Sequence, residues 1–267
     1  MILKAVWAVT EREIIRMSRQ KVRLFASMVR PLIWLFVIGS GVGSIAPEIN
    51  GQPYTDYLIP GVLGMTVLFG AMLAALTTVY DKESGVMRMM IVAPLPHYWI
   101  VMAKALSASI ASLIQACFLI FILVIIGLLE LNIVLVFVAG AIALASLCCS
   151  GIGMLTACFS KSLDNFAAVM NFVIFPIFFI SGSLYPVDNL PFLLKIFALV
   201  NPYTYAVDLI KHSLSKQNPL MSGDMSLSLD ICVVIFFSIF AITIASWAFS
   251  REHNHEPLIK RITNTGP

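Results

Sequence analysis

Charged side chains are scarce in this chain of 267 residues. They make up 12% of the sequence, against about 25% in soluble domains, while apolar residues reach 60%. A water-soluble packing needs more polar positions than this, so the composition argues against a soluble domain. The sequence also contains no GxxxxGK(S/T) motif, the loop that cradles nucleotide phosphates. We therefore expect a membrane-embedded protein without a nucleotide-binding loop of this type.

Cysteines are few as well, and they lie in apolar surroundings. The five are Cys117, Cys148, Cys149, Cys158 and Cys232. In such places cysteine acts as a small apolar packing residue, so we expect neither disulfides nor thiol ligands. The one GxxxG pair in the first apolar stretch, Gly39 and Gly43, indicates close contact between helices and lacks the strand and lysine of a phosphate loop.

Six long apolar stretches occupy about half of the chain. They are residues 28–46, 57–79, 101–128, 133–158, 166–185 and 229–249. A hydrocarbon core about 30 Å thick is crossed by roughly 20 helical residues, so each stretch can span it. The stretches are continuously apolar instead of alternating, which predicts helices and not a barrel. The fold class is all-α, a polytopic membrane protein with six transmembrane helices.

The residues before the first span predict an amphipathic helix. Its apolar face is formed by Leu3, Val6, Trp7, Thr10, Ile14 and Met17, and off that face lie Arg12, Glu13, Arg16, Arg19 and Arg23. The helix either lies in the cytoplasmic headgroup layer or packs on the protein itself. Its mixed charges predict no cleaved leader. We divide the chain into this helix (1–27), a six-helix transmembrane domain (28–250) and a cytoplasmic tail (251–267).

The basic residues alternate along the chain. Seven lie within residues 1–30, up to the start of the first span, and none lies in 47–56. Fourteen of the seventeen fall on one side of a six-span arrangement. Because cytoplasmic loops retain Lys and Arg, both termini and the loops at 80–100 and 159–165 are predicted to be cytoplasmic. The segment 186–228 is then outside, although it contains Lys195, Lys211 and Lys216. The expected location is the inner or plasma membrane.

The loop from Tyr80 to Tyr98 is too polar at its start to span, and it stops at Pro94 and Pro96. It predicts a short cytoplasmic helix with an exit turn. A plain connector would need only a few residues, whereas nineteen residues with a charged, methionine-rich face indicate a docking surface.

The outer segment contains an apolar stretch, residues 190–200, that is too short to cross. We expect it to be re-entrant or to lie along the outer interface, followed by a second short helix that begins at Pro202. Pro176 should kink the fifth helix, because a proline inside a helix removes one hydrogen bond and clashes with the preceding turn.

Ionisable residues are nearly missing from the interiors of the predicted spans. The interiors contain the uncharged polar residues Gln115 and Asn171, and the charged residues Lys104 and Asp230 lie at span ends. Ion-coupled carriers and membrane enzymes need such groups at depth. His253 and His255 in the tail could bind a metal, but a solvated tail explains them as well, and we predict no metal site. The chain should therefore take its energy from a partner.

Five features resemble the membrane subunits of type 2 ABC exporters, the ABC-2 permease family. They are the amphipathic lead-in to Pro31, Tyr57-Leu58-Ile59-Pro60-Gly61, the loop from Glu83 to Arg88 with Pro94-Leu95-Pro96, the exit Phe179 to Pro186, and Asn201-Pro202. The resemblance covers nearly the whole chain and is closest to nodulation-type and multidrug-type permeases.

This resemblance implies a homodimer or pseudo-dimer that exports an amphipathic or hydrophobic molecule, a drug or a lipid-linked or glycolipid-like compound. Two copies of a cytoplasmic ATPase would bind ATP and Mg, with no cofactor in this chain, no enzymatic role for it, and no nucleic acid among its partners. It implies an ATPase-docking loop with Asp81, Lys82, Glu83, Gly85, Arg88 and Pro94, and an outer gate with Gly182, Tyr185, Pro186, Pro191, Asn201 and Pro202. Residues that could line the path are Met170, Asn171, Phe175, Phe178 and Phe179.

Two other function classes stay open at this point. A secondary transporter driven by an ion gradient would show midplane carboxylates or glycine breaks at matching places in two halves. An intramembrane enzyme would show a Ser with a His, or paired Asp residues, within its spans. We find neither pattern in the sequence.

Overall fold

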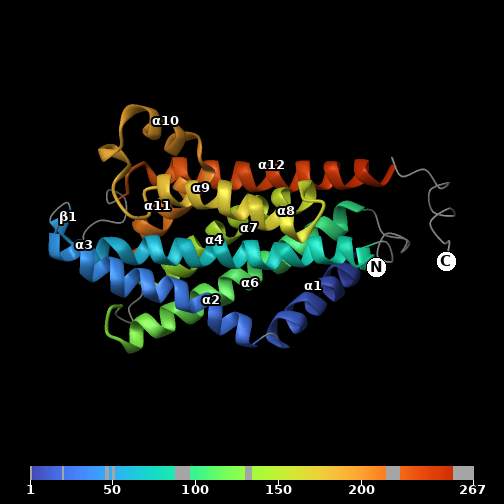
Figure 1. The fold of residues 1–267 in the computed structure, drawn as a ribbon, viewed down its shortest axis with the longest axis horizontal. Coiled ribbons are helices and arrows are strands. Elements are labelled where there is room, and N and C mark those ends of the chain that lie inside the picture. The colour runs from blue at the N-terminus through green and yellow to red at the C-terminus, as the bar shows by residue number, and fades with distance from the viewer. Residues whose placement is uncertain are drawn as a thin grey trace.

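A computed structural model describes residues 2–19, 21–45, 48–49, 52–87, 97–129, 134–214 and 223–254. Its described part is almost entirely helical and forms one elongated bundle (Figure 1). Six helical stretches are long and apolar enough to cross a membrane: Ser27–Ile45, Tyr54–Glu83, Tyr98–Ile125, Val136–Phe159, Leu163–Ile180 and Leu227–Ser250. This confirms the all-α class and the six predicted spans. The start of α1 and the end of α12 lie at the same end of the bundle, as an even number of crossings requires (Figure 1).

The lead-in consists of two helices, α1 (Ile2–Arg19) and α2 (Lys21–Ile33). Helix α1 packs against α6 (His97–Ile125), and it buries Thr10 and Glu13 while Trp7 is 65% exposed. The inward face is thus rotated from the predicted apolar face, because Glu13 finds basic partners inside the protein. Helix α2 continues through a π-helical turn, η1 (Trp34–Ile38), into α3 (Gly39–Ile45), and together these form the first span.

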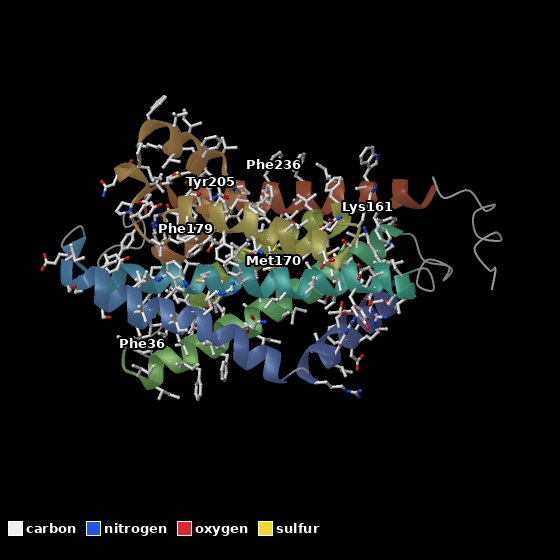
Figure 2. All side chains as sticks on the ribbon, in the orientation of Figure 1. Phe36, Lys161, Met170, Phe179, Tyr205 and Phe236 are labelled. Atoms are coloured by element: carbon white, nitrogen blue, oxygen red, sulfur yellow. The ribbon has the colours of Figure 1, made fainter. Side chains whose placement is uncertain are left out.

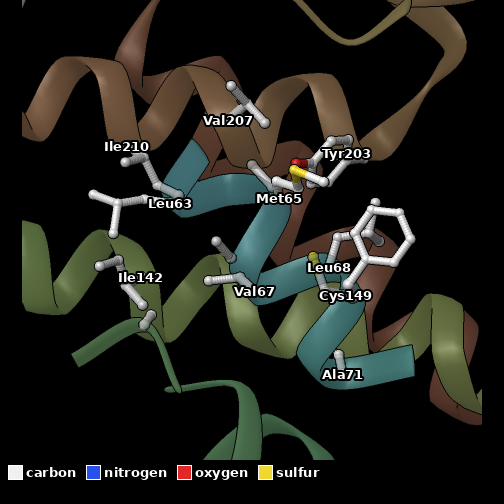
Figure 3. Packing of buried hydrophobic residues seen from close by; sticks show 14 of the residues in the cluster. Leu63, Met65, Val67, Leu68, Ala71, Ile142, Cys149, Tyr203, Val207 and Ile210 are labelled. Atoms are coloured by element: carbon white, nitrogen blue, oxygen red, sulfur yellow. The ribbon is translucent and has the colours of Figure 1, made fainter. Parts of the chain in front are cut away.

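Helix α4 (Tyr54–Glu83) is the central element, and 78% of the residues in its most apolar 18-residue stretch are buried. It packs against α6, α7 (Val134–Phe159) and α11 (Pro202–Leu214). Figure 3 shows its side chains Leu63, Met65 and Leu68 between residues of α7 and α11. Lipid supplies no hydrophobic force between helices, so close backbone approach is needed for packing. Gly153 provides it, because a Cβ there would lie 2.9 Å from the Cβ of Ala75.

The fifth span combines α8 (Leu163–Val169), η2 (Met170–Ile174) and α9 (Phe175–Ile180). Pro176 lies in the first turn of α9, directly after the π-helical turn η2. A π-helical turn changes the hydrogen-bond register next to the proline, which cannot donate a backbone hydrogen bond. The helix is thus irregular directly before Pro176, while the kink expected there stays a prediction.

The outer end holds the remaining elements. They are the paired two-residue strands β1 (Glu48–Ile49) and β2 (Gln52–Pro53), the short helix η3 (Val187–Asn189), α10 (Phe192–Val200), α11 and the start of α12 (Leu227–Asn254). Helices α10 and α11 bend by 83° at Asn201, so the apolar stretch that was too short to cross folds back at this end. Phe36 and Phe236 project from opposite sides of the bundle and are 50% and 72% exposed (Figure 2).

All five cysteines are free thiols. Cys148, Cys149 and Cys158 are buried, whereas Cys117 and Cys232 are exposed on the bundle. Of the GxxxG pair, Gly39 lies against Leu58, but a Cβ on Gly43 would meet nothing within 4 Å. The described chain therefore uses only one of these two glycines for internal contact.

Candidate functional site

An ionic cluster joins three helices at the end of the bundle where α1 begins. Its members, here called the α1–α4–α6 ionic cluster, are Arg12, Glu13, Arg16, Asp81 and Lys104. Lys104 donates to Asp81 at 2.6 Å and to Glu13 at 3.3 Å. Asp81 also accepts from Arg16 at 3.1 Å and from Arg12 at 3.2 Å. Three cations thus surround two buried carboxylates, and they tie α1 to the second and third spans.

Glu13 shows the electrostatic effect of this cluster. Burial raises the pKa of a carboxyl group, but the charges of Lys104 and Arg12 outweigh it and hold the pKa of Glu13 below its ordinary value. The pKa of Arg12 is lowered by partial burial and raised more strongly by Glu13 and Asp81. Both groups are therefore held in their charged forms, which keeps α1 fastened to the bundle.

The residues predicted for ATPase docking begin inside this cluster. Asp81 is only 1% exposed, so its carboxylate serves the contacts within the chain and is not presented at the surface. Lys82 donates to the carbonyl of Cys158 at 2.8 Å, and Glu83 accepts from the backbone N–H of Leu163 at 3.0 Å. Among the described charged residues of the loop, Glu83 is therefore the exposed one, and Ser84 beside it is exposed as well.

A turn follows these charged residues. Gly85 has φ of +74°, a backbone conformation that favours glycine, and no atom lies within 4 Å of a Cβ built there. Arg88 and Pro94 fall outside the described residues. The docking role of the loop stays a prediction.

The residues predicted as an outer gate form one hydrogen-bonded region. Asn201 donates to the carbonyl of Ile177 at 2.9 Å and accepts from the backbone N–H of Tyr203 at 3.0 Å, so it links the fifth span to the start of α11. Tyr185 donates to the carbonyl of Phe179 at 2.7 Å. Pro186 and Pro191 directly precede η3 and α10, and Pro202 begins α11. The structure brings these residues together, while a gating role stays a prediction.

Two glycines allow this region to pack against α4. Gly182 has φ of +77°, and its carbonyl accepts from the hydroxyl of Tyr57 at 3.0 Å. A Cβ on Gly61 would overlap the carbonyl of Ser183. The sequence Tyr57-Leu58-Ile59-Pro60-Gly61 and the exit of the fifth span therefore touch each other, although more than 120 residues separate Tyr57 from Gly182.

The predicted path residues are distributed between the inside and the outside of the bundle. Phe178 is buried, with its ring edge-on to Trp34 at a centroid distance of 5.8 Å, and Phe179 contacts the same indole at 5.7 Å. Phe175 is half-buried against Phe69. Asn171 is exposed.

Met170 lines a cavity of about 240 Å³ between α2, α4, α6 and η2, near the middle of the bundle (Figure 2). The guanidinium of Arg30 lies at this cavity, 4.7 Å from the centroid of Phe69 and 5.5 Å from that of Phe175. Gln115 and Thr66 add polar atoms to its wall. The cavity therefore combines one cation, aromatic faces and a few polar groups.

A second charged group lies at the opposite end and was missed by sequence reasoning. Its members, here called the outer polar cluster, are Tyr57, Asp208, Lys211, His212, Asp224 and Asp230. Lys211 donates to Asp224 at 2.7 Å and to the Tyr57 hydroxyl at 3.0 Å. Lys211 and Asp208 were expected on an outer helix, but not buried. The available signal was the spacing of Asp208 and His212, four residues apart on one helix face.

Comparisons with known proteins agree with this arrangement. The chain is 25% identical over 230 residues to a putative transport permease, ycf38, of Cyanophora paradoxa, which covers 84% of this chain and 78% of that protein. It is 26% identical to Nodulation protein J of Rhizobium leguminosarum bv. trifolii, over 75% of this chain and 74% of that protein. It is 25% identical to the inner membrane transport permease YadH of Escherichia coli (strain K12), over 77% of this chain and 79% of that protein.

The family model for the ABC-2 type transporter matches residues 4–214, which include the lead-in helix, the first five spans and the outer helices up to the end of α11. This match covers well over half of the chain. The six spans and the relatives that are named transport permeases are consistent with a membrane subunit of a transporter. The chain belongs to the ABC-2 type transporter family.

Proposed function

We propose that this chain is the membrane subunit of an ATP-driven exporter for an amphipathic or hydrophobic molecule. A separate cytoplasmic subunit, bound in two copies, would hold ATP and Mg and hydrolyse the nucleotide. The supporting observation is the position of the acidic residues in the six spans. Each one lies within four residues of a span end, namely Asp56, Asp81, Glu83, Asp164 and Asp230. An ion-coupled carrier places such groups near the midplane, so the free energy is supplied by a partner.

The cavity at Arg30 favours an amphipathic substrate with an acidic group. A guanidinium over aromatic rings attracts an anion while the rings contact apolar parts of the molecule. Ligand pockets usually enclose about 300–1,000 Å³, so a cavity of about 240 Å³ holds only part of a drug-sized or lipid-linked molecule. We place the head group of the substrate at Arg30 and its apolar part along Phe175 and Phe179.

We propose a homodimer in which the second copy covers the first and fifth spans. Only 17% of the fifth span is buried within one chain, and Asn171, near its middle, exposes a polar amide. A polar side chain that faces lipid is unfavourable, so contact with a second copy or with a polar path explains Asn171 better. Each of these two spans also contains a π-helical turn, a feature that often occurs at functional sites. Lipid then covers other exposed apolar residues such as Phe236.

The proposed orientation places both termini in the cytoplasm of a cell with this protein in its inner or plasma membrane. The support is the count of basic residues, fourteen of seventeen on one side. The end with the α1–α4–α6 ionic cluster then faces the ATPase, and the end with α10 and α11 faces outward.

The decisive experiment reconstitutes the chain in liposomes, alone or with the cytoplasmic ATPase subunit that co-purifies with it. The probes are two fluorescent lipids with the same acyl chains, phosphatidylglycerol as the acidic one and phosphatidylcholine as the zwitterionic one. We expect ATP-dependent translocation only when both subunits are present, and none when the ATPase carries an inactive catalytic residue. Translocation by the chain alone under an imposed proton gradient would instead establish the secondary-transporter alternative.

A variant links the cavity to the substrate class. Arg30→Gln should reduce the translocation rate of the acidic lipid about tenfold relative to that of the zwitterionic lipid. A tenfold change in rate corresponds to only about 1.4 kcal/mol, which the loss of one charge interaction can supply. Equal slowing of both lipids would show that Arg30 acts through packing and not through its charge.

Docking is tested by charge reversal at the exposed end of the loop. Glu83→Lys should weaken co-purification of the ATPase subunit, and Glu48→Lys, at an exposed glutamate on the opposite end, should not. Retention of the ATPase by both variants would remove Glu83 from the docking surface.

A further inference from the structure

Three side chains of the outer polar cluster can ligate a metal ion. Asp208 and His212 lie on α11 and Asp230 lies in the first turn of α12, and one ligand atom from each falls within 4.8 Å of the other two. The Nε2 atom of His212 lies 3.3 Å from Oδ2 of Asp230 and 3.8 Å from Oδ2 of Asp208. The carbonyl oxygen of Met225 is 3.0 Å from the same nitrogen. Three atoms that commonly bind metals therefore lie close together, and a carbonyl oxygen lies beside the imidazole nitrogen among them.

Asp230 provides a second, independent observation. The residue is fully buried, and neither of its carboxylate oxygens accepts a hydrogen bond from a residue in the described part of the chain. Asp208 differs, because its two oxygens accept from the backbone N–H groups of Asp224 and Met225 at 2.8 Å each. The His212 imidazole approaches Oδ2 of Asp230 to 3.3 Å without forming a hydrogen bond to it. A buried carboxylate without a hydrogen bond is costly, and a bound cation would remove that cost.

The charge of the cluster also calls for a cation. Asp208, Asp224 and Asp230 carry three negative charges when ionised, and Lys211 carries one positive charge, so the net charge is −2 with a neutral imidazole. Lys211 is directly paired with Asp224 at 2.7 Å. The two uncompensated charges therefore belong to Asp208 and Asp230, and one divalent cation would neutralise them.

The spacing and the donor types narrow the choice of ion. Four ligands at about 2.0–2.1 Å from a tetrahedral centre lie roughly 3.3–3.4 Å apart. The three separations from Nε2, 3.0, 3.3 and 3.8 Å, bracket that value. One imidazole nitrogen with carboxylate and carbonyl oxygens suits a divalent transition metal better than Mg²⁺, which prefers six oxygens and retains water.

We propose that Asp208, His212 and Asp230, with the carbonyl oxygen of Met225, bind one divalent transition-metal ion, of which Zn²⁺ is the first to test. In the absence of the ion, Nε2 of the neutral His212 imidazole donates its proton to the Met225 carbonyl, and when Nε2 binds the ion the ring keeps this proton on Nδ1 instead. The ion fastens α11 to the start of α12. Gly223 is required beside it, because a Cβ there would overlap Nε2 of His212. The proposal does not depend on the transport function.

The test uses the full chain purified in detergent, freed of metal with EDTA and then titrated with Zn²⁺ at neutral pH. Bound metal is counted by mass spectrometry after gel filtration, and the unfolding temperature is measured alongside. We expect one Zn²⁺ per chain and a higher unfolding temperature with metal. Asp230→Asn should weaken Zn²⁺ binding at least about tenfold, the scale on which even supporting groups of metal sites act.

Two controls separate this site from adventitious binding. Asp188→Asn changes a carboxylate at the same end that is 71% exposed and should leave Zn²⁺ binding unchanged. His253→Ala with His255→Ala removes the tail histidines and should also leave it unchanged. Binding that survives Asp230→Asn, or that disappears in the tail variant, would overturn the proposal.

A spectroscopic measurement decides the matter if Asp230→Asn does not fold. Co²⁺ bound to the unmodified chain should give the intense visible bands of tetrahedral coordination, and the tail variant should give the same bands. Weak octahedral bands, or no bands, would contradict the site.

Discussion

Lys104 and Asp81 lie on different spans, are each about 2% exposed, and form an ion pair with 2.6 Å between Nζ and Oδ2. Two charges at this depth stabilise the fold only as partners, because each alone would be left buried without compensation. Arg12 and Arg16 add further charge from α1. The pair is therefore the point at which the lead-in helix and two spans are connected.

Removal of one partner from this pair should destabilise the protein strongly. We expect Asp81→Asn or Lys104→Met to lower the free energy of unfolding in detergent by about 3–5 kcal/mol. The double variant should lose less than the sum, since it leaves neither charge unpaired. Lys195→Met, in the exposed pair with Asp188, should cost less than about 1 kcal/mol. Additive losses in the double variant would contradict a direct interaction.

Acid should release α1 through Glu13. The pKa of Glu13 is lower in the folded protein than its ordinary value of 4.5, so its stabilising effect is complete above pH 4.5 and is lost as the pH falls through the folded-state pKa. The difference in unfolding free energy between the unmodified chain and Glu13→Gln should therefore shrink as the pH is lowered below 4.5. The measurement is thermal unfolding between pH 7 and pH 3. Glu11→Gln, an exposed neighbour on α1, should show no such difference at any pH.

Gly61 is required where α4 touches the exit of the fifth span. Gly61→Ala adds a Cβ that would overlap the Ser183 carbonyl, so α4 and residues 181–184 must move apart. We expect a loss of about 1–3 kcal/mol, the usual cost of overpacking. Gly41→Ala, where no atom lies within 4 Å of the new Cβ, should change stability by less than about 1 kcal/mol. An equal effect of both substitutions would show that helix propensity, and not the close approach, controls the result.

Asn171 tests the proposed homodimer. In a variant with Cys117 and Cys232 changed to alanine, Asn171→Cys should form a disulfide between two copies in native membranes under mild oxidation. Phe236→Cys, which is exposed on α12, should not. The readout is a band of twice the chain mass on a non-reducing gel. Cross-linking at Phe236 but not at Asn171 would move the interface to the sixth span.

Much of the architecture could be predicted because membrane insertion depends on local composition. Each apolar stretch of about 20 residues can cross the bilayer independently of the others. The ends of the six predicted spans therefore agree with the ends of the observed helices to within about five residues. The apolar stretch before Asn201 was recognised as too short to cross for the same reason. The π-helical turn η2 was not predicted, because the sequence suggested only a kink at Pro176 and the hydrogen-bond register depends on neighbouring helices.

The sites were harder to predict, because they depend on contacts between distant residues. Asp81 looked like a surface charge in a loop, and only its contacts with Lys104, Arg12 and Arg16 show why it is buried. Asp208 and His212 looked like polar residues of an outer helix, and Asp230 like a span end. Their meeting requires α11 to fold back by 83° onto the bundle and pack beside α12.

Composition alone thus specified a helical membrane protein with six spans and a basic end, because the transfer of each segment into lipid depends on the residues of that segment. Which charges neutralise one another depends on which helices become neighbours. That choice is made by side-chain contacts between segments far apart in the sequence, such as Tyr57 and Lys211, which are 154 residues apart, and no local pattern in the chain encodes it.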